Sequence, residues 1–337
     1  MPVVFPRSDP EDIAWRFCVA PMMDWTDRHC RYLHRQLTRR ARLYTEMVTC
    51  GALLHGDVQR HLDFDDAEHP VALQLGGSDP AELAQCARLG ERWGYDEINL
   101  NCGCPSERVQ RGSFGACLMA EPELVADCIK AMQDAVSVPV TVKHRIGIDK
   151  TEDYGFVARF VGVLYDAGCR VFLVHARNAW LRGLSPKENR EVPPLRYDVV
   201  RRLKRDFGAA RFVLNGGLAD WEQVDGALHD LDGVMLGRAA YHDPWMLARV
   251  DEALFGVPAP VDSREAVIER MRGYLLRHVA TGTAARNVVR HVLGLYLGCP
   301  GARRWRRLLS DPRFLDEHGP NVLDAAARAF AGPAMAG

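Results

Sequence analysis

The sequence VPVTVKHRIGIDKTEDYGFVARFVGVLYDAGCRVFLVHAR, residues 138–177, decides the expected fold. Val138–Lys143 and Val171–His175 are short apolar runs rich in Val, which is typical of buried strands. Between them, Asp153–Ala167 carries apolar residues at helical spacing. A strand, a helix and a second strand in this order indicate a βαβ unit with parallel strands.

The same alternation extends over most of the chain. Helices are expected between the strands at Pro80–Trp93, Glu121–Ala135, Asp198–Phe207 and Trp221–His229. Eight strands alternating with helices predict a (β/α)₈ TIM barrel, which typically takes about 250 residues. A doubly wound open sheet is the alternative, but it usually has fewer strands, and no GxGxxG fingerprint opens the chain. The six further strands are expected at Phe17–Ala20, Leu43–Met47, Val71–Leu75, Glu97–Asn101, Phe212–Asn215 and Gly233–Leu236.

The chain is longer than one barrel needs. Its 337 residues suggest a second domain, and the turn-rich segment Phe255–Pro260 is a plausible linker. We therefore predict a barrel domain over residues 1–254, followed by a small all-helical domain over residues 258–337. The helices expected in the second domain are Ser263–Thr281, with Ser263 as N-cap, Thr283–Leu297, Ala302–Leu309 and one near Asn321–Phe330.

Composition narrows the class of protein. Hydrophobic residues make up 47% and charged residues 26%, as in globular proteins, and no apolar run reaches the roughly 18 residues that span a bilayer. The N-terminal sequence MPVVFPRSDPEDIAW lacks the features of a signal peptide. The ten cysteines are scattered and include no CxxC pair, so no metal site is expected. We expect a cytoplasmic protein with no membrane association and no obligate protein partner.

Charge is distributed unevenly along the chain. The net charge is −1, yet residues from Pro258 onward contain 12 basic and 7 acidic side chains. A basic C-terminal region on an acidic body indicates either a face for an anionic partner or a solvated helical surface.

Polar and reactive residues mark the end of almost every expected strand. The active site of a TIM barrel is built at these carboxyl ends. One such residue is explained by capping, but eight strand ends in register predict a functional site. The residues are Pro21, Met22, Met23 and Asp24; Glu46; Gln74; Asn99, Asn101, Cys102 and Cys104; Lys143, His144 and Arg145; His175 and Arg177; Asn215, Gly216 and Gly217; and Gly237 and Arg238.

The last two strand ends predict a phosphate site. Loops after strands seven and eight usually bind phosphate in this fold, and the glycines there let backbone N–H groups approach an anion. Arg238 can add a charge-assisted hydrogen bond. A tight turn is the alternative explanation of Asn215-Gly216-Gly217, and the neighbouring Gly237-Arg238 favours phosphate.

Three further side chains suggest chemistry. Lys143 interrupts an apolar strand, so it either meets an anionic ligand or pairs with a carboxylate such as Glu46. His175 is either a core histidine or a ligand contact. Cys104 follows a sharp turn at Gly103, which places a thiol over the barrel mouth as nucleophile, metal ligand or acid.

The chain resembles the tRNA-dihydrouridine synthases, and within them most closely the A subfamily. The resemblance covers nearly the whole chain, in long motifs that occur in order. They are APMMDWTDRHCR at 20–31, QLGGSDP at 74–80, EINLNCGCPS at 97–106, GSFGACLM at 112–119, TVKHRIGID at 141–149, HARNAWLRGLSPKENREVPPLRY at 175–197, LNGG at 214–217, LGRAAYHDPW at 236–245 and RHVLGLYLGCPGARRWRRLLSD at 290–311.

This resemblance implies an FMN-binding barrel and a helical tRNA-binding domain. It implies that FMN contacts Pro21, Met22, Met23, Gln74, Lys143 and His175, with its phosphate on Asn215, Gly216, Gly217, Gly237 and Arg238. Cys104 takes the acid position, and Cys102 stands where we expect an apolar residue. The residues that match tRNA contacts are Asn101, Lys187, Arg190, Arg303 and Arg306.

The implied reaction reduces the C5–C6 double bond of D-loop uridines 20 and 20a. NADPH reduces FMN, N5 of the flavin gives hydride to C6, and Cys104 protonates C5. The uracil must be flipped out of the folded tRNA, whose D-loop and elbow are the expected partner. The alternatives are an FMN-dependent dehydrogenase of small dihydropyrimidines or dihydroorotate, and a tRNA-binding protein without catalysis.

Overall fold

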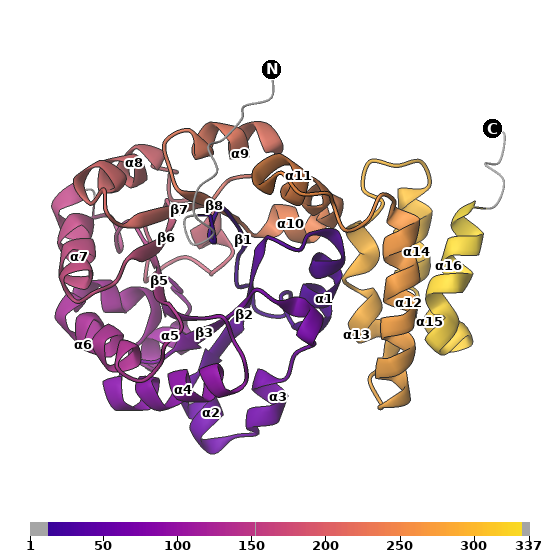
Figure 1. Cartoon of the computed structure of the whole chain (residues 1–337), viewed down its shortest axis with the longest axis horizontal. Helices are drawn as coiled ribbons and strands as arrows, with labels where there is room; N and C mark the ends of the chain where they lie inside the picture. The colour runs from indigo at the N-terminus through magenta and orange to yellow at the C-terminus, as the bar shows by residue number, and fades with distance from the viewer. Residues whose placement is uncertain (1–12, 152, 332–337) are drawn as a thin grey trace. The chain divides into compact units, whose positions relative to one another are not determined.

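Eight parallel strands close into a barrel in the computed structural model, which describes residues 13–151 and 153–331. Each strand pairs with the next along the chain, and β1 pairs with β8. The predicted TIM barrel is therefore confirmed (Figure 1). The strands are β1 (Phe17–Val19), β2 (Arg42–Thr49), β3 (Val71–Gly76), β4 (Glu97–Cys102), β5 (Val140–Arg145), β6 (Val171–His175), β7 (Arg211–Asn215) and β8 (Gly233–Leu236).

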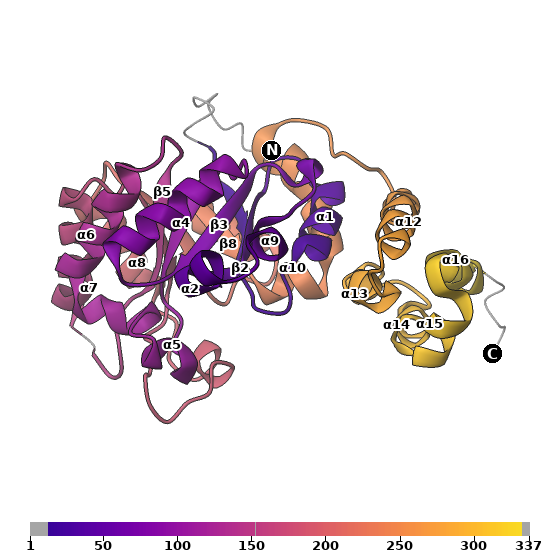
Figure 2. The same ribbon diagram turned by 90° about the horizontal axis from the view of Figure 1, so that it is seen from below.

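Helices cover the outside of the barrel, as Figure 1 shows. They begin where the sequence offers caps: Asp79 accepts a hydrogen bond from the Glu82 amide and precedes Pro80 at the start of α4. The helices of this layer are α2 (Cys50–His55), α3 (Val58–Leu62), α4 (Pro80–Arg92), α6 (Pro122–Gln133), α7 (Tyr154–Asp166), α8 (Tyr197–Asp206) and α9 (Trp221–Leu228), while α5 (Glu107–Arg111) lies in the loop after β4, at one end of the barrel (Figure 2).

The barrel interior is apolar over much of its depth. Because side chains alternate between the two faces of a strand, every second residue points inward. The buried inward cluster contains Trp15, Cys18, Ala20, Tyr44, Ala72, Val171, Leu173, Val213 and Met235. The outward residues pack against the helices; His144, for example, contacts Phe160 of α7 with ring centroids 5.2 Å apart.

The carboxylate of Glu97 lies inside this apolar interior. Glu97, the first residue of β4, is fully buried. It accepts hydrogen bonds from Trp15 Nε1 at 2.7 Å, the Tyr44 hydroxyl at 2.8 Å and the Thr141 hydroxyl at 2.5 Å, and it pairs with Arg42 at 3.1 Å. Burying a charge is tolerable only with such partners, so Glu97 ties β2, β4, β5 and the segment before β1 together.

The described chain forms two compact units. One contains the barrel and runs over residues up to 23 and 42–237; the other combines residues 24–41 with those from 238 onward. The predicted domains, 1–254 and 258–337, include residues 1–12 and 332–337, which lie outside the described residues, and their boundaries stay a prediction. The helices of the second unit are α1 (Arg28–Leu37), α10 (Arg238–His242), α11 (Val250–Phe255), α12 (Arg264–Ala280), α13 (Ala285–Val289), α14 (Ala302–Ser310), α15 (Pro312–His318) and α16 (Val322–Ala331).

Asp27 joins the two sequence segments of the second unit. It caps α1 by accepting from the His29 and Cys30 amides at 3.0 Å, and it pairs with Arg290 at 2.5 Å and His291 at 3.0 Å. Burial alone would raise the pKa of Asp27, but these partners hold it well below its ordinary value. The ion pairs therefore fasten α1 to the end of α13.

The predicted helix Thr283–Leu297 is wrong. The chain leaves α13 at Val289 and forms only a 3₁₀ turn at Val292–Gly294. A Cβ on residue 294 would lie 2.3 Å from the carbonyl oxygen of His242, so the backbone can pass this close only because residue 294 is glycine. Helix α15 was missed, although Asp311 before Pro312 is a recognisable start signal.

In the residues that the structure describes, no helix has the length and apolar character needed to cross a bilayer.

We expect Glu97→Gln to lower the free energy of unfolding by about 3 kcal/mol or more, because an amide nitrogen replaces one acceptor among buried donors. Chemical denaturation measures the change. Glu123→Gln is the control, because it removes an ion pair with Arg159 in which each side chain is 63% exposed. This change should lower the free energy of unfolding by less than about 1 kcal/mol. Equal losses in the two variants would contradict the structural role of Glu97.

Candidate functional site

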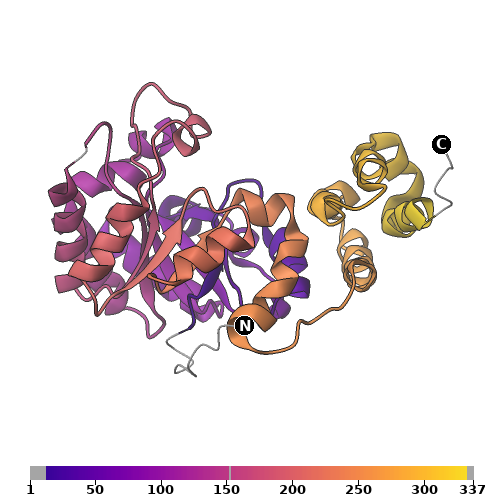
Figure 3. The same ribbon diagram turned by 90° about the horizontal axis from the view of Figure 1, so that it is seen from above.

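The carboxyl ends of the strands bring most of the predicted site residues together. In the strand register Asn101 lies beside Lys143, Arg145 beside His175, and His175 beside Asn215. Their spacing along each strand places all five on the inward face. The loops that follow β4 and β6 lie at this same end of the barrel, as α5 and the segment after β6 show in Figures 2 and 3. One hydrogen bond joins these loops, from Gln110 Nε2 to the Leu181 carbonyl at 2.8 Å.

Lys143 is a cation in the barrel mouth without a carboxylate partner among the described residues. Its Nζ donates to Asn215 Oδ1 at 3.1 Å, and Asn215 in turn donates to the Met235 carbonyl at 2.7 Å. The expected alternative pairing with Glu46 is therefore wrong. Burial, together with the charges of Arg145 and Arg190, lowers the pKa of Lys143 to about 7, although Cys104 raises it. An anionic ligand beside Nζ would favour the charged form.

Positive charge surrounds His175. Burial lowers the pKa of His175 well below its ordinary value, and the charges of Arg145, Lys143, Arg177 and Arg190 lower it further. The imidazole is therefore neutral at neutral pH and offers one donor and one acceptor nitrogen. Such a concentration of cations around a neutral ring is suited to an anionic ligand.

Arg145 is the last residue of β5, and no role was predicted for it beyond marking a strand end. The side chain is buried and donates to the Gly103 carbonyl at 3.2 Å and the Asn189 carbonyl at 2.9 Å. It thereby holds the loop that carries Cys104 and the loop after β6. The signal was available, because Arg145 follows Lys143 by two residues and must share its inward face.

The turn after β7 requires glycine twice. Gly216 and Gly217 have φ values of 108° and 74°, in the region that other residues rarely adopt. A Cβ on Gly216 would lie 2.7 Å from His175 Cδ2, and one on Gly217 would lie 2.4 Å from Leu195. The Tyr197 hydroxyl fixes the turn by donating to the Gly216 carbonyl at 2.6 Å. The backbone therefore passes close to His175 at the predicted phosphate position.

The end of β8 has a different geometry. A Cβ on Gly237 would meet only Met22 Sδ at 3.4 Å and Ala20 Cβ at 3.6 Å, which are ordinary contacts. The protein itself does not demand glycine there, so the space is open to a ligand. Arg238 follows as the first residue of α10. After β1, Pro21 and Met22 are half-buried, and Met23 is 57% exposed.

Amide side chains form the floor of the mouth. Asn101 Nδ2 donates to Gln74 Oε1 at 2.9 Å, and Gln74 Nε2 donates to Asn99 Oδ1 at 2.7 Å. Asn101 Oδ1 accepts from the Gly103 and Cys104 amides at 3.1 and 3.0 Å. Asn101 therefore holds the backbone turn that carries Cys104.

The two thiols of this segment lie in different environments. Cys102 is fully buried on the outward face of β4, next to His144 of β5, and burial raises its pKa well above the ordinary value. Cys104 is half-buried in the loop, with Sγ 3.5 Å from Ser106 Oγ. It lies close enough to Lys143 and Arg145 to oppose, without outweighing, the lowering of their pKa values by burial. Cys104 is thus the thiol of the mouth, and Cys102 packs in the core.

The two predicted basic pairs occupy one unit each. Lys187 and Arg190 are exposed on the loop after β6, which is held from within by the buried Asn189: its Oδ1 accepts from the Trp180 amide at 2.7 Å. Arg303 and Arg306 are exposed on α14. The buried Trp305 between them donates to the Val292 carbonyl at 2.9 Å and anchors the helix in its own unit.

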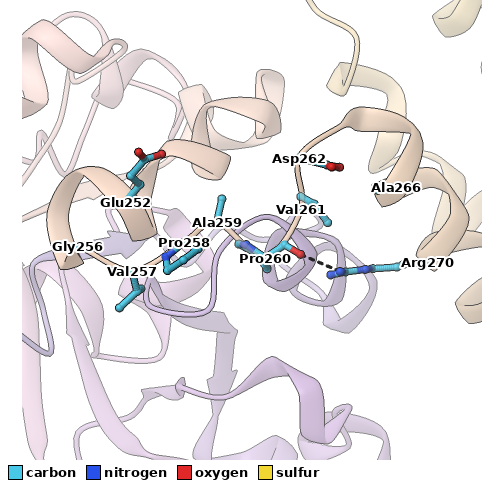
Figure 4. A pocket seen from close by; sticks show the side chains of 10 residues that line it. All are labelled: Glu252, Gly256, Val257, Pro258, Ala259, Pro260, Val261, Asp262, Ala266 and Arg270. Atoms are coloured by element: carbon cyan, nitrogen blue, oxygen red, sulfur yellow. Dashed lines mark hydrogen bonds between the residues drawn. The ribbon is translucent and has the colours of Figure 1, made fainter.

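A large hollow elsewhere carries none of these residues. It has a volume of about 800 Å³, belongs to the second unit and is drawn in Figure 4. Arg270 crosses it to donate to the Pro260 carbonyl at 2.8 Å. The hollow is lined by the turn-rich linker and offers no convergent reactive groups, so the barrel mouth is the candidate active site.

Comparison with known proteins identifies the family of this chain. The profile of the dihydrouridine synthase (Dus) family matches residues 18–331. The chain is 59% identical to the tRNA-dihydrouridine(20/20a) synthase of Pseudomonas syringae pv. tomato, over 97% of each chain. It is 58% identical to the enzyme of that name from Pseudomonas aeruginosa, over 97% of this chain and 98% of the other, and 55% identical to that of Synechocystis sp., over 92% and 93%. Enzymes of this family depend on a flavin. The chain therefore belongs to the dihydrouridine synthase family, the oxidoreductases that reduce uridine to dihydrouridine in tRNA.

Proposed function

We propose that this chain reduces uridines 20 and 20a in the D-loop of tRNA, with FMN as cofactor, NADPH as reductant and Cys104 as acid. The observation that carries the proposal is the meeting, in one barrel mouth, of an unpaired cation, a double-glycine turn and a half-buried thiol. The relatives quoted above carry these two uridine positions in their names.

The residues of the mouth fit FMN. Lys143 and the arginines around His175 offer charge to an anionic ligand, and the open space at Gly237, next to the glycine turn at Gly216 and Gly217, leaves room for its phosphate. We place the flavin against Gln74, Lys143 and His175, with Pro21, Met22 and Met23 beside it, and Arg238 and Asn215 at the phosphate. When bound, FMN supplies the hydride that uracil C6 receives, after reduction by NADPH.

Cys104 is the proposed proton donor to uracil C5. Its loop is fixed by two backbone hydrogen bonds to Asn101, so the thiol stays over the mouth. A positioned acid contributes roughly 10²–10⁴-fold to a rate. Cys102 cannot take this role because its thiol is buried on the other face of β4.

Binding of tRNA is proposed to use charge at several places. A uracil ring must leave the base stack to reach the mouth, where Asn101 contacts it. Lys187 and Arg190 in the barrel unit, and Arg303 and Arg306 in the helical unit, are exposed and suited to phosphate contacts that position the D-loop and elbow. We place the reaction in the cytoplasm, where its substrate is found.

The FMN site is tested by Gly216→Ala. A methyl group there meets His175 and strains the backbone, so we expect FMN to dissociate at least about tenfold more readily. Fluorescence quenching of FMN measures the affinity. Gly226→Ala is the matched control, because that glycine lies exposed on α9 with no atom within 4 Å of the added methyl. Arg238→Ala is expected to weaken binding too; wild-type protein that takes up no FMN would overturn the assignment.

The acid is tested by comparing Cys104→Ala with Cys102→Ala. We expect Cys104→Ala to keep flavin reduction by NADPH at the wild-type rate and to lower dihydrouridine formation by about 10²-fold or more, because only the proton transfer is lost. Stopped-flow absorbance and mass spectrometry of the tRNA measure the two steps. Cys102→Ala should keep both steps near wild type. The assignment is wrong if the two variants exchange these behaviours.

The tRNA contact of α14 is tested by the double change Arg303→Ala with Arg306→Ala. We expect weaker tRNA binding and a salt dependence reduced by a slope of about 1 to 2, since two phosphate contacts release fewer counterions. Filter binding across a salt titration measures both. Arg202→Ala with Arg205→Ala removes the same charge from the exposed side of α8 and should leave the slope unchanged. If the salt dependence of tRNA binding has the same slope in both double variants, Arg303 and Arg306 do not contact tRNA and only solvate an exposed helix.

A further inference from the structure

A continuous chain of hydrogen bonds leads from the buried Glu97 carboxylate to the backbone of Cys104. Thr141 Oγ1 donates to Glu97 Oε1 at 2.5 Å, and Asn99 Nδ2 donates to Thr141 Oγ1 at 2.8 Å. Gln74 Nε2 then donates to Asn99 Oδ1 at 2.7 Å, and the Asn101 amide donates to Gln74 at 2.9 Å. The last bond runs from the Cys104 amide to Asn101 Oδ1 at 3.0 Å. The chain therefore crosses the interior from β4 and β5 to the mouth.

The direction of every bond in this chain is fixed from its buried end. A carboxylate that pairs with Arg42 can only accept, so the Thr141 hydroxyl must donate its one proton to Glu97. The Thr141 oxygen then accepts from Asn99, which turns the Asn99 carbonyl toward Gln74. Asn99 is fully buried and Gln74 is 1% exposed, so water does not replace these partners. The nitrogen and the oxygen of each side-chain amide are therefore satisfied by neighbours in the chain of hydrogen bonds. At the outer end, the backbone N–H of Cys104 can only donate, which agrees with the same direction.

This direction decides what the mouth offers a ligand. Asn101 Oδ1 already accepts two backbone N–H groups, and Gln74 Oε1 accepts from Asn101. Each amide nitrogen has used one of its two protons. The remaining groups of Gln74 and Asn101 are therefore mainly N–H donors, which select hydrogen-bond acceptors such as the carbonyl oxygens of a flavin or a uracil ring.

We propose that Glu97, acting through Thr141, is a positioning residue of this enzyme. It fixes Gln74 and Asn101 with their donors toward the ligands and holds the backbone of Cys104. The part that concerns FMN rests on the function proposed above. Without the Thr141 hydroxyl, Asn99 loses the partner of its nitrogen. The orientation of Gln74 and Asn101 is then held only from the outer end, by the Gly103 and Cys104 amides, and no longer from both ends.

The test compares two hydroxyl deletions at the same carboxylate oxygen. Thr141→Val and Tyr44→Phe each remove one donor to Glu97 Oε1, but only Thr141 also accepts from Asn99. Thr141→Ser keeps the hydroxyl and is the rescue variant. The alkylation rate of Cys104 by iodoacetamide in flavin-free protein, followed on its own peptide by mass spectrometry, reports the loop without any activity. The affinity for FMN reports Gln74.

We expect Thr141→Val to speed alkylation of Cys104 about fivefold or more and to weaken FMN binding about tenfold, because a buried donor loses its partner. Thr141→Ser and Tyr44→Phe should stay within about twofold of wild type on both readouts. If Thr141→Val fails to fold, Thr141→Ala is measured in its place.

Two results would overturn the proposal. Equal effects of Thr141→Val and Tyr44→Phe would show that Glu97 acts on stability alone, and a Thr141→Val protein that matches wild type would show that the chain positions nothing. If wild-type protein binds no FMN, the proposed cofactor fails, but the alkylation rates still decide the role of Glu97 at the Cys104 loop.

Discussion

The carboxylate of Glu97 is the interaction on which the barrel depends. A buried charge is costly, and here Trp15, Tyr44, Thr141 and Arg42 all point donors at its two oxygens. These partners come from segments far apart in the sequence, so the carboxylate is satisfied only when the barrel has closed. The same group, through the amides of Asn99, Gln74 and Asn101, sets the hydrogen-bond direction at the opposite end of the strands.

The mouth combines two kinds of preorganisation. Lys143, Arg145 and the arginines of the loop after β6 collect positive charge around the neutral ring of His175. The backbone at Gly216 and Gly217 adopts a conformation that requires glycine. A site of fixed charges and fixed backbone is suited to an anionic ligand because it need not reorganise, and the thiol of Cys104 lies in a loop at the same mouth.

Much of the fold and of the candidate site was predictable from sequence, because side chains alternate between the two faces of a strand with a period of two. Short apolar runs predicted all eight strands to within about two residues, and the sharp turn expected at Gly103 placed Cys104 over the mouth. Long-range pairing was not predictable. No local signal in the sequence says that Lys143 would meet Asn215 rather than Glu46, or that Glu97 would collect donors from three segments of the chain. Arg290 and His291, in the break between Val289 and Val292, likewise pair with Asp27, more than 260 residues away in sequence.

This barrel mouth is proposed to reduce D-loop uridines of tRNA. The most direct measurement is a map of dihydrouridine in tRNA from cells that lack this gene, and from the same cells with the gene restored. We expect dihydrouridine to disappear from positions 20 and 20a on deletion and to return with the wild-type gene. Dihydrouridine that persists at both positions in the deleted strain, or a loss at other positions alone, would contradict this proposal.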